Sequence, residues 1–272
     1  MRYGEFALEG WTTTDNRRAS LESPTKLDRA RPPRGVEGRW RLTLYPEARE
    51  AGGCFVSGSM PRDVGQVPEP SGDRAADEAA RRARGKVRRY CAANRLNRLG
   101  TLTYGPPFCR DADALREDVG TFFRHLRRRT GPLPYLWTPE LHSDGERYHV
   151  HFAVGRFVHY AWIREAWGRG HVHIKLLGDL PVGSGSLGEA RLAARYLSKY
   201  IGKALDASPY ALHRYEVAEG YQPQSVRIEA SSLGEVWAEA AYAMAGEPEY
   251  RWDSGTDPGW RGPHAVWASW AD

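Results

Sequence analysis

Residues 140–152 read ELHSDGERYHVHF, which is the pattern of a β-hairpin. Asp144 and Gly145 signal its turn, because a two-residue turn needs backbone conformations that aspartate and glycine tolerate. Apolar residues alternate with polar ones after the turn, as they do in a strand that buries one face. We therefore predict two antiparallel strands, over 135–142 and 148–157.

The second strand of this hairpin carries two histidines, His149 and His151, separated by one residue. Side chains alternate along a strand, so both imidazoles point to one face. If Asp144 and Gly145 form the turn, Glu140 lies directly opposite His149, and cross-strand partners share a face. Two imidazoles and a carboxylate with open positions suit Mg²⁺ or Mn²⁺ acting on phosphate. The sequence therefore predicts a metal site made of His149, His151 and Glu140.

Another His-x-His pattern occurs at His171 and His173, also on a predicted strand. Such a pattern alone is more often polar surface than a ligand set. Within eight positions upstream the only acidic residue is Glu165, which falls in a predicted helix. We therefore expect the first pair, with its facing glutamate, to be the metal site and the later pair not to be one.

The elements around the hairpin complete one domain. The spacing of apolar residues predicts strands over 99–104 and 171–177, and helices over 113–129, 160–167 and 187–205. In chain order the elements are β-α-β-β-α-β-α. This order predicts an α+β fold, with one antiparallel sheet of split βαβ (RRM-like) type and helices packed on it.

The composition divides the chain into three parts. Residues 1–72 are rich in Arg, Pro, Gly and Ser, and we expect them to be partly irregular. Residues 73–206 hold the predicted domain, with a basic helix leading into it. Residues 207–272 form a C-terminal extension whose last 26 residues have no clear pattern.

Three segments of the flanking parts do have regular patterns. Alternating apolar residues predict a strand over 40–44, and another strand is predicted over 225–229. A helix over 233–245 is predicted to begin with a capping box formed by Ser232 and Glu235.

Basic residues cluster in the helix predicted over 73–96, for which Asp73 is the expected N-cap. The chain carries a net charge of +5, and no acidic residue interrupts this cluster. A basic cluster attracts a polyanion such as DNA, although a run of charges can also be a solvated helix face. The residues that we expect to contact DNA are Arg81, Arg82, Arg84, Lys86, Arg88 and Arg89, together with Lys203 of a later helix.

Tyr196 and Tyr200 are four residues apart on the helix predicted over 187–205, so their side chains are neighbours on one face. Lys199 and Lys203 form an adjacent basic edge at the same spacing. A phenol attacks phosphorus only when nearby cations stabilise its phenolate, because its pKa is about 10. The alternative interpretation is that the two tyrosines belong to a stripe of core residues.

Taken together, these motifs resemble those of the HUH endonucleases, specifically the replication initiators of rolling-circle plasmids and single-stranded DNA phages. Residues 101–104 (TLTY) resemble the family's first motif, and residues 149–151 (HVH) resemble its histidine motif. Residues 196–203 (YLSKYIGK) resemble the paired-tyrosine form of the third motif. The resemblance covers roughly residues 97–206, well under half of the chain.

The resemblance implies a metal-dependent, site-specific endonuclease of HUH fold that nicks one DNA strand at an origin and starts rolling-circle replication. In that family the histidines bind Mg²⁺ or Mn²⁺, and a tyrosine forms a 5′-phosphotyrosine link with the DNA. Tyr200 and Tyr196 are then the candidate nucleophiles, and Lys199 positions the phosphate. Tyr200 is slightly favoured to attack first because it lies between Lys199 and Lys203.

The expected partner is single-stranded or origin DNA. The sequence contains no GxxxxGK[ST] loop, so we also expect a host helicase to unwind the duplex. A transposase or a relaxase of the same superfamily would share the metal chemistry. In relaxases the tyrosine usually precedes the histidines, and here it follows them. A third alternative is a non-enzymatic, RRM-like nucleic-acid-binding protein, which would expose aromatic residues on its sheet.

The composition fits a soluble, globular protein with 41% hydrophobic and 27% charged residues. No apolar run approaches the length of a membrane span, and the N-terminus lacks the apolar segment of a secretory signal. The three cysteines are odd in number and widely spaced, which excludes a disulfide framework and fits a reducing compartment. We therefore expect a cytoplasmic protein without membrane contacts.

Overall fold

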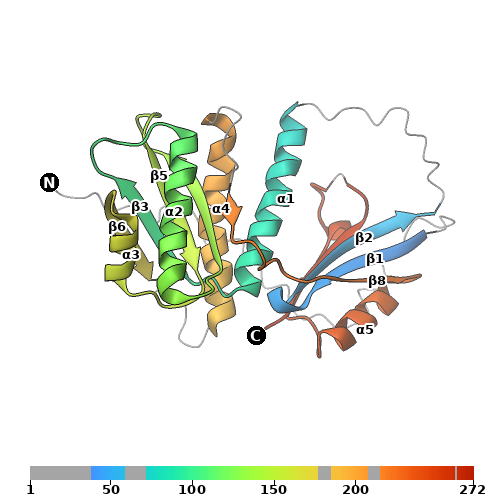
Figure 1. Cartoon of the computed structure of the whole chain (residues 1–272). Coiled ribbons are helices and arrows are strands. Elements are labelled where there is room, and N and C mark those ends of the chain that lie inside the picture. The colour runs from blue at the N-terminus through green and yellow to red at the C-terminus, as the bar shows by residue number, and fades with distance from the viewer. Residues whose placement is uncertain (1–37, 59–71, 177–184, 208–214, 261) are drawn as a thin grey trace. The chain divides into compact units, whose positions relative to one another are not determined.

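The computed structural model describes residues 38–58, 72–176, 185–207, 215–260 and 262–272 (Figure 1). Within these residues the chain forms two antiparallel five-stranded sheets and five α-helices. The predicted α+β class is confirmed, and a second sheet is added to it. In the same ranges no helix is long and apolar enough to cross a membrane. The irregular structure predicted for residues 1–37 lies outside the described residues.

One sheet, which we call the site sheet, has the strand order β6-β3-β5-β4-β7. Its strands are β3 (Arg98–Tyr104), β4 (Tyr135–Leu141), β5 (Tyr148–Val154), β6 (Gly170–Leu176) and β7 (Glu216–Val217). β3 lies between β5 and β6 and is antiparallel to both, as the split βαβ order predicts. β5 ends at Val154, earlier than predicted, because Gly155 sits against the backbone of Asn94, where a side chain has no room.

Helices pack on both faces of the site sheet. Their bounds are Gly72–Ala93 for α1, Ala112–Thr130 for α2, Tyr160–Trp167 for α3 and Gly185–Ala207 for α4. On one face, Val150 and Phe152 of β5 pack with the apolar residues of α2 and α3. On the other face, Ala153 packs with apolar residues of α1 and α4. The alternation along β5 therefore turns the two histidines toward the face on which α4 lies.

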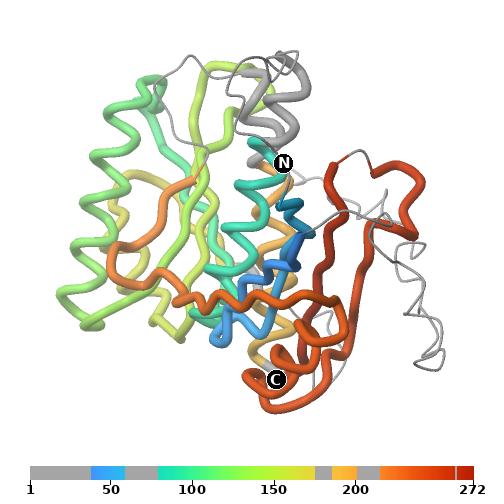
Figure 2. The backbone as a smooth tube through the Cα atoms, turned by 90° about the vertical axis from the view of Figure 1, so that its right-hand side faces the viewer, coloured from blue at the N-terminus to red at the C-terminus, as the bar shows by residue number. Residues whose placement is uncertain are grey.

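The remaining sheet, which we call the flanking sheet, has the strand order β8-β1-β2-β10-β9. Its strands are β1 (Gly38–Tyr45), β2 (Glu50–Ser57), β8 (Val226–Ala230), β9 (Tyr250–Asp253) and β10 (Ala265–Ser269). Helix α5 (Leu233–Ala243) packs on one face of this sheet and begins with the predicted capping box. In Figure 2, β9 and β10 run side by side at the red end of the chain.

Three predictions for the flanking parts need correction. β2 lies in a segment that was expected to be irregular, and β9 and β10 lie in the tail to which no structure was assigned. Helix α1 begins at Gly72, so Asp73 lies in its first turn and is not its N-cap. An acidic residue there still faces the positive end of the helix dipole. The division at residues 72 and 206 remains a prediction, although strands from both outer parts pair in the flanking sheet.

Candidate active site

The hairpin of β4 and β5 has the register predicted from its turn. Glu140 pairs with His149, and Thr138 pairs with His151. Gly145 adopts a φ of 73°, the left-handed conformation that suits glycine at this position. The prediction that a carboxylate faces the histidine strand is therefore confirmed.

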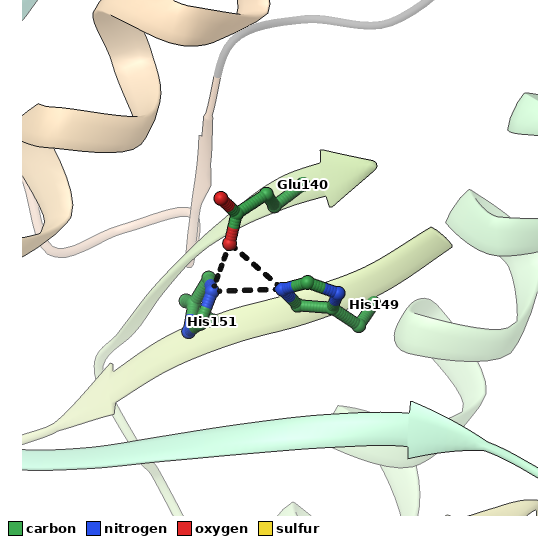
Figure 3. A group of neighbouring side chains, drawn as sticks. All are labelled: Glu140, His149 and His151. Atoms are coloured by element: carbon green, nitrogen blue, oxygen red, sulfur yellow. Dashed lines mark hydrogen bonds and ion pairs between the residues drawn. The ribbon is translucent and has the colours of Figure 1, made fainter. Parts of the chain in front are cut away.

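Glu140, His149 and His151 form a tight group, which we call the metal cluster (Figure 3). Glu140 Oε2 lies 2.7 Å from Nε2 of each histidine, and the two Nε2 atoms are 3.1 Å apart. Neighbouring ligands of an ion bonded at about 2.1 Å lie about 3 Å apart, so these three atoms are spaced as ligands of one ion. The cluster could hold a divalent metal ion.

The metal cluster is largely shielded from solvent. The side chain of His151 is 7% exposed, that of His149 is 14% exposed and that of Glu140 is 19% exposed. Burial alone raises the pKa of Glu140. The hydrogen bonds and positive charge of the two histidines outweigh burial, so the net pKa lies well below its usual range. Glu140 is therefore an anion at neutral pH, which is the form that a cation needs.

Two further contacts orient the imidazoles. Thr101 Oγ1 on β3 lies 3.1 Å from Nδ1 of His151. Nδ1 of His149 is buried and makes no hydrogen bond with any described residue. His142 lies on the same face, with its ring centroid 4.5 Å from that of His149, and its pKa is lowered by burial and by the neighbouring cations. Sequence reasoning missed the role of Thr101, because its contact depends on how β3 pairs with β5.

The tyrosine pair of α4 lies directly against the metal cluster. The ring of Tyr200 stacks on the imidazole of His151, with centroids 4.0 Å apart and planes 16° apart. The ring of Tyr196 meets His151 edge-on at 6.0 Å, and the Tyr200 hydroxyl donates a hydrogen bond of 2.8 Å to the Tyr196 hydroxyl. Both phenols and the predicted ligands therefore share one site.

These tyrosines are not core residues in the ordinary sense. The fully buried stripe of α4 consists of small and apolar residues, namely Ala190, Ala193, Ala194 and Leu197. Tyr196 and Tyr200 lie beside that stripe and are only partly buried. Burial is the largest cause that raises the pKa of Tyr200, and its hydrogen bond to Tyr196 adds to it. In the absence of a bound cation this phenol stays protonated at neutral pH.

The basic residues of α4 lie on the solvent side of the tyrosines. Lys199 is exposed, and its Nζ atom lies 6.0 Å from the centroid of the Tyr196 ring. Arg195 is also exposed. The side chain of Lys203, predicted to contact DNA, lies outside the described residues.

The cations of α1 fall into two groups. Arg88 donates to Glu50 of β2 at 2.8 Å, and its guanidinium stacks on Trp267. Arg89 lies 3.6 Å from Glu50 and stacks on Tyr45, so both arginines are bound within the fold. The other four are exposed, and we call them the α1 basic edge: Arg81, Arg82, Arg84 and Lys86.

The histidine pair of β6 lies on the same face as the metal cluster. His171 pairs with Thr103 of β3, which pairs with His149, and His173 pairs with Thr101, which pairs with His151. Both side chains are exposed, in contrast to the buried cluster. Neither belongs to the group of described residues whose ligand atoms are close enough to share a metal ion.

Comparison with known proteins matches residues 97–205 to a family model of replication-associated proteins of the ORF2 type. The match runs from the start of β3 to the last turn of α4, and it includes both the metal cluster and the tyrosine pair. No curated protein and no solved structure matched the chain. The part of the chain that builds the candidate site is thus similar to replication-associated proteins.

Proposed function

We propose that this protein is a replication initiator that nicks one strand of an origin by metal-dependent attack of a tyrosine, as an HUH endonuclease does. The observation that carries the proposal is the stacking of Tyr200 on His151 at 4.0 Å, because it brings a phenol to the edge of the metal cluster. The match of the same segment to replication-associated proteins favours replication over transposition or conjugative relaxation.

The reaction is a transesterification. The hydroxyl oxygen of Tyr196 or Tyr200 forms a bond to the scissile phosphorus, and the bond from phosphorus to the 3′ oxygen breaks. The phenol loses its proton, and the leaving 3′ oxygen gains one. The products are a 5′-phosphotyrosine and a free 3′ hydroxyl, from which a polymerase can extend.

Residues of this chain supply the environment of the step. His149, His151 and Glu140 would hold the Mg²⁺ or Mn²⁺ ion, which when bound stabilises negative charge on the phosphate oxygens. Lys199 adds a cation on the solvent side of Tyr196 and is placed to hold the phosphate or stabilise the phenolate. The pair of tyrosines allows one hydroxyl to cut and the other to receive a second strand.

DNA would reach the site with help from exposed cations. The α1 basic edge and Arg195 offer positive charge that suits a phosphate backbone. A host helicase would unwind the origin, because the sequence contains no ATPase loop of the GxxxxGK[ST] type.

An RRM-like binding protein without catalytic activity is the main alternative of another class. The sheet face that such a protein uses to stack bases carries histidines and a glutamate here, and Tyr200 of α4 covers His151. This arrangement disfavours base stacking on the strands next to the cluster.

The polarity of the covalent link tests the proposal. Purified protein is mixed with single-stranded oligonucleotides of randomised sequence, labelled at one end, and Mn²⁺ or EDTA is added. With Mn²⁺, a 3′-end label should migrate with the protein on a denaturing gel, and a 5′-end label should be released on the shorter fragment. EDTA should abolish both products. No adduct with Mn²⁺, or a protein-bound 5′-end label, would contradict the proposal.

A further inference from the structure

The register of the site sheet arranges polar side chains in two parallel rows across four strands. One row runs through His171, Thr103, His149 and Glu140, and the other runs through His173, Thr101, His151 and Thr138. Directly paired residues point to the same face of a sheet, so all eight side chains share the face on which α4 lies.

Exposure changes in one direction along these rows. Thr138 and His151 are buried, Thr101 and Thr103 are partly buried, and His171 and His173 are exposed. Helix α4 packs on β4, β5 and β3, whereas β6 is packed against α3 on the opposite face. The rows therefore form a lane that is open over β6 and ends at the metal cluster.

The chemistry of the lane suits a phosphate backbone. Hydroxyl and imidazole groups can all donate hydrogen bonds, and the sequences of β3, β5 and β6 contain no acidic residue. The only carboxylate in the rows is Glu140, at the closed end, where it belongs to the metal cluster. An anion that lies over β6 and β3 thus meets donors and no like charge.

We propose that His171 and His173 bind the backbone of single-stranded DNA beside the scissile phosphate and guide the strand along this lane to the metal cluster. The inference rests on the proposed function. The two histidine pairs are two strand spacings apart, roughly 10 Å, so one strand of DNA can contact both with neighbouring phosphates. His171 and His173 would position the substrate without taking part in the chemical step.

The test measures DNA binding separately from cleavage. In a Tyr196→Phe/Tyr200→Phe background with EDTA, the fluorescence anisotropy of labelled oligo(dT) reports equilibrium binding. His171→Gln/His173→Gln should raise Kd about ten-fold, as expected for the loss of hydrogen bonds to a charged group. The matched control is His125→Gln, because His125 is an exposed histidine on α2, which packs on the opposite face. It should change Kd less than about two-fold.

Arginine variants distinguish a phosphate contact from a structural role. His171→Arg/His173→Arg should restore the affinity for oligo(dT) and make it depend more steeply on salt, because each new cation releases a counterion. In the protein with both tyrosines, the glutamine variant should raise KM for nicking and leave kcat nearly unchanged.

Two results would overturn the inference. One is an unchanged Kd in the glutamine variant. The other is equal loss of binding in the arginine and glutamine variants. If the glutamine variant instead loses only an additional equivalent of bound Mn²⁺ or Zn²⁺, the pair is a metal site and not a DNA contact. Failure of the proposed function is separable, because the binding assay needs neither metal nor tyrosine hydroxyls.

Discussion

Thr101→Val isolates the single side-chain contact that β3 makes to the metal cluster. A metal ion takes the lone pair of His151 Nε2, which requires the neutral imidazole to carry its proton on Nδ1. Thr101 Oγ1, 3.1 Å from Nδ1, can accept that proton's hydrogen bond, and in the ion-free state the same hydroxyl can donate instead. Valine has nearly the same shape as threonine and can do neither.

The magnitude follows from the difference between the two states. A hydrogen bond to an imidazole polarised by a cation contributes about 1.5–3 kcal/mol, and a neutral one contributes about 0.5–1.5 kcal/mol. The ion-bound state therefore loses roughly 1.4 kcal/mol more than the ion-free state, which is about a ten-fold weaker Kd for Mn²⁺. The free energy of unfolding of the ion-free protein should fall by about 1 kcal/mol.

The assay is isothermal titration of Mn²⁺ into the wild type and two variants. Thr103→Val is the matched control, since Thr103 pairs with His149 on the same face, yet Nδ1 of His149 has no partner among the described residues. Its Kd should stay within about two-fold of the wild-type value. Equal Kd values for Thr101→Val and the wild type, or an equal loss in Thr103→Val, would refute this reasoning.

Three other predictions concern the metal cluster, the α1 basic edge and the ion pair of Glu50. Replacing any one residue of the metal cluster by Ala should abolish Mn²⁺-dependent nicking, whereas His171→Ala should keep it at saturating DNA; the reverse pattern in a gel assay would place the metal at the wrong pair. Neutralising the α1 basic edge with Gln should flatten the slope of log Kd for DNA against log salt, and an unchanged slope would make it a solvated face. Glu50→Gln should lower the free energy of unfolding by about 2 kcal/mol, because a 2% exposed carboxylate holds Arg88 and Arg89 while both arginines keep some contact with water. Glu216→Gln, which breaks the more exposed pair with Arg116, should cost clearly less in urea unfolding, and equal losses would contradict the role of burial.

Local patterns were sufficient to predict much of the site. The Asp144-Gly145 turn fixed the register of its hairpin, so the sequence alone placed Glu140 opposite His149. Helical spacing likewise put Tyr196 and Tyr200 on one face of α4. In both cases the information lies within a few residues of the chain, where turn and helix geometry act.

Long-range pairing could not be predicted in the same way. β2 contains Gly52 and Gly53 and shows no clean alternation, so its strand exists because β1 and β10 pair on either side of it. The same pairing explains β10, which lies in a tail rich in Trp, Gly and Pro. The sequence also could not show that His171 shares a face with His149, because that fact depends on β3 lying between them.

The charges of α1 illustrate a related limit. Six cations in one run have the same pattern in the sequence, but Arg88 and Arg89 bind Glu50, which comes from a strand that the sequence did not indicate. Their role in the fold could be recognised only once that partner was placed. The four exposed residues of the α1 basic edge stay candidates for the predicted contact with DNA.

Mapping the residue that becomes linked to DNA tests the central claim most directly. Trypsin cuts after Arg195, Lys199 and Lys203, so Tyr196 and Tyr200 fall in separate peptides, 196–199 and 200–203. After reaction with single-stranded oligonucleotides and Mn²⁺, mass spectrometry should find the nucleotide adduct on one of these two peptides. Tyr196→Phe/Tyr200→Phe should form no adduct. An adduct on any other tyrosine, such as Tyr104 or Tyr215, or one that persists in the double variant, would contradict the account.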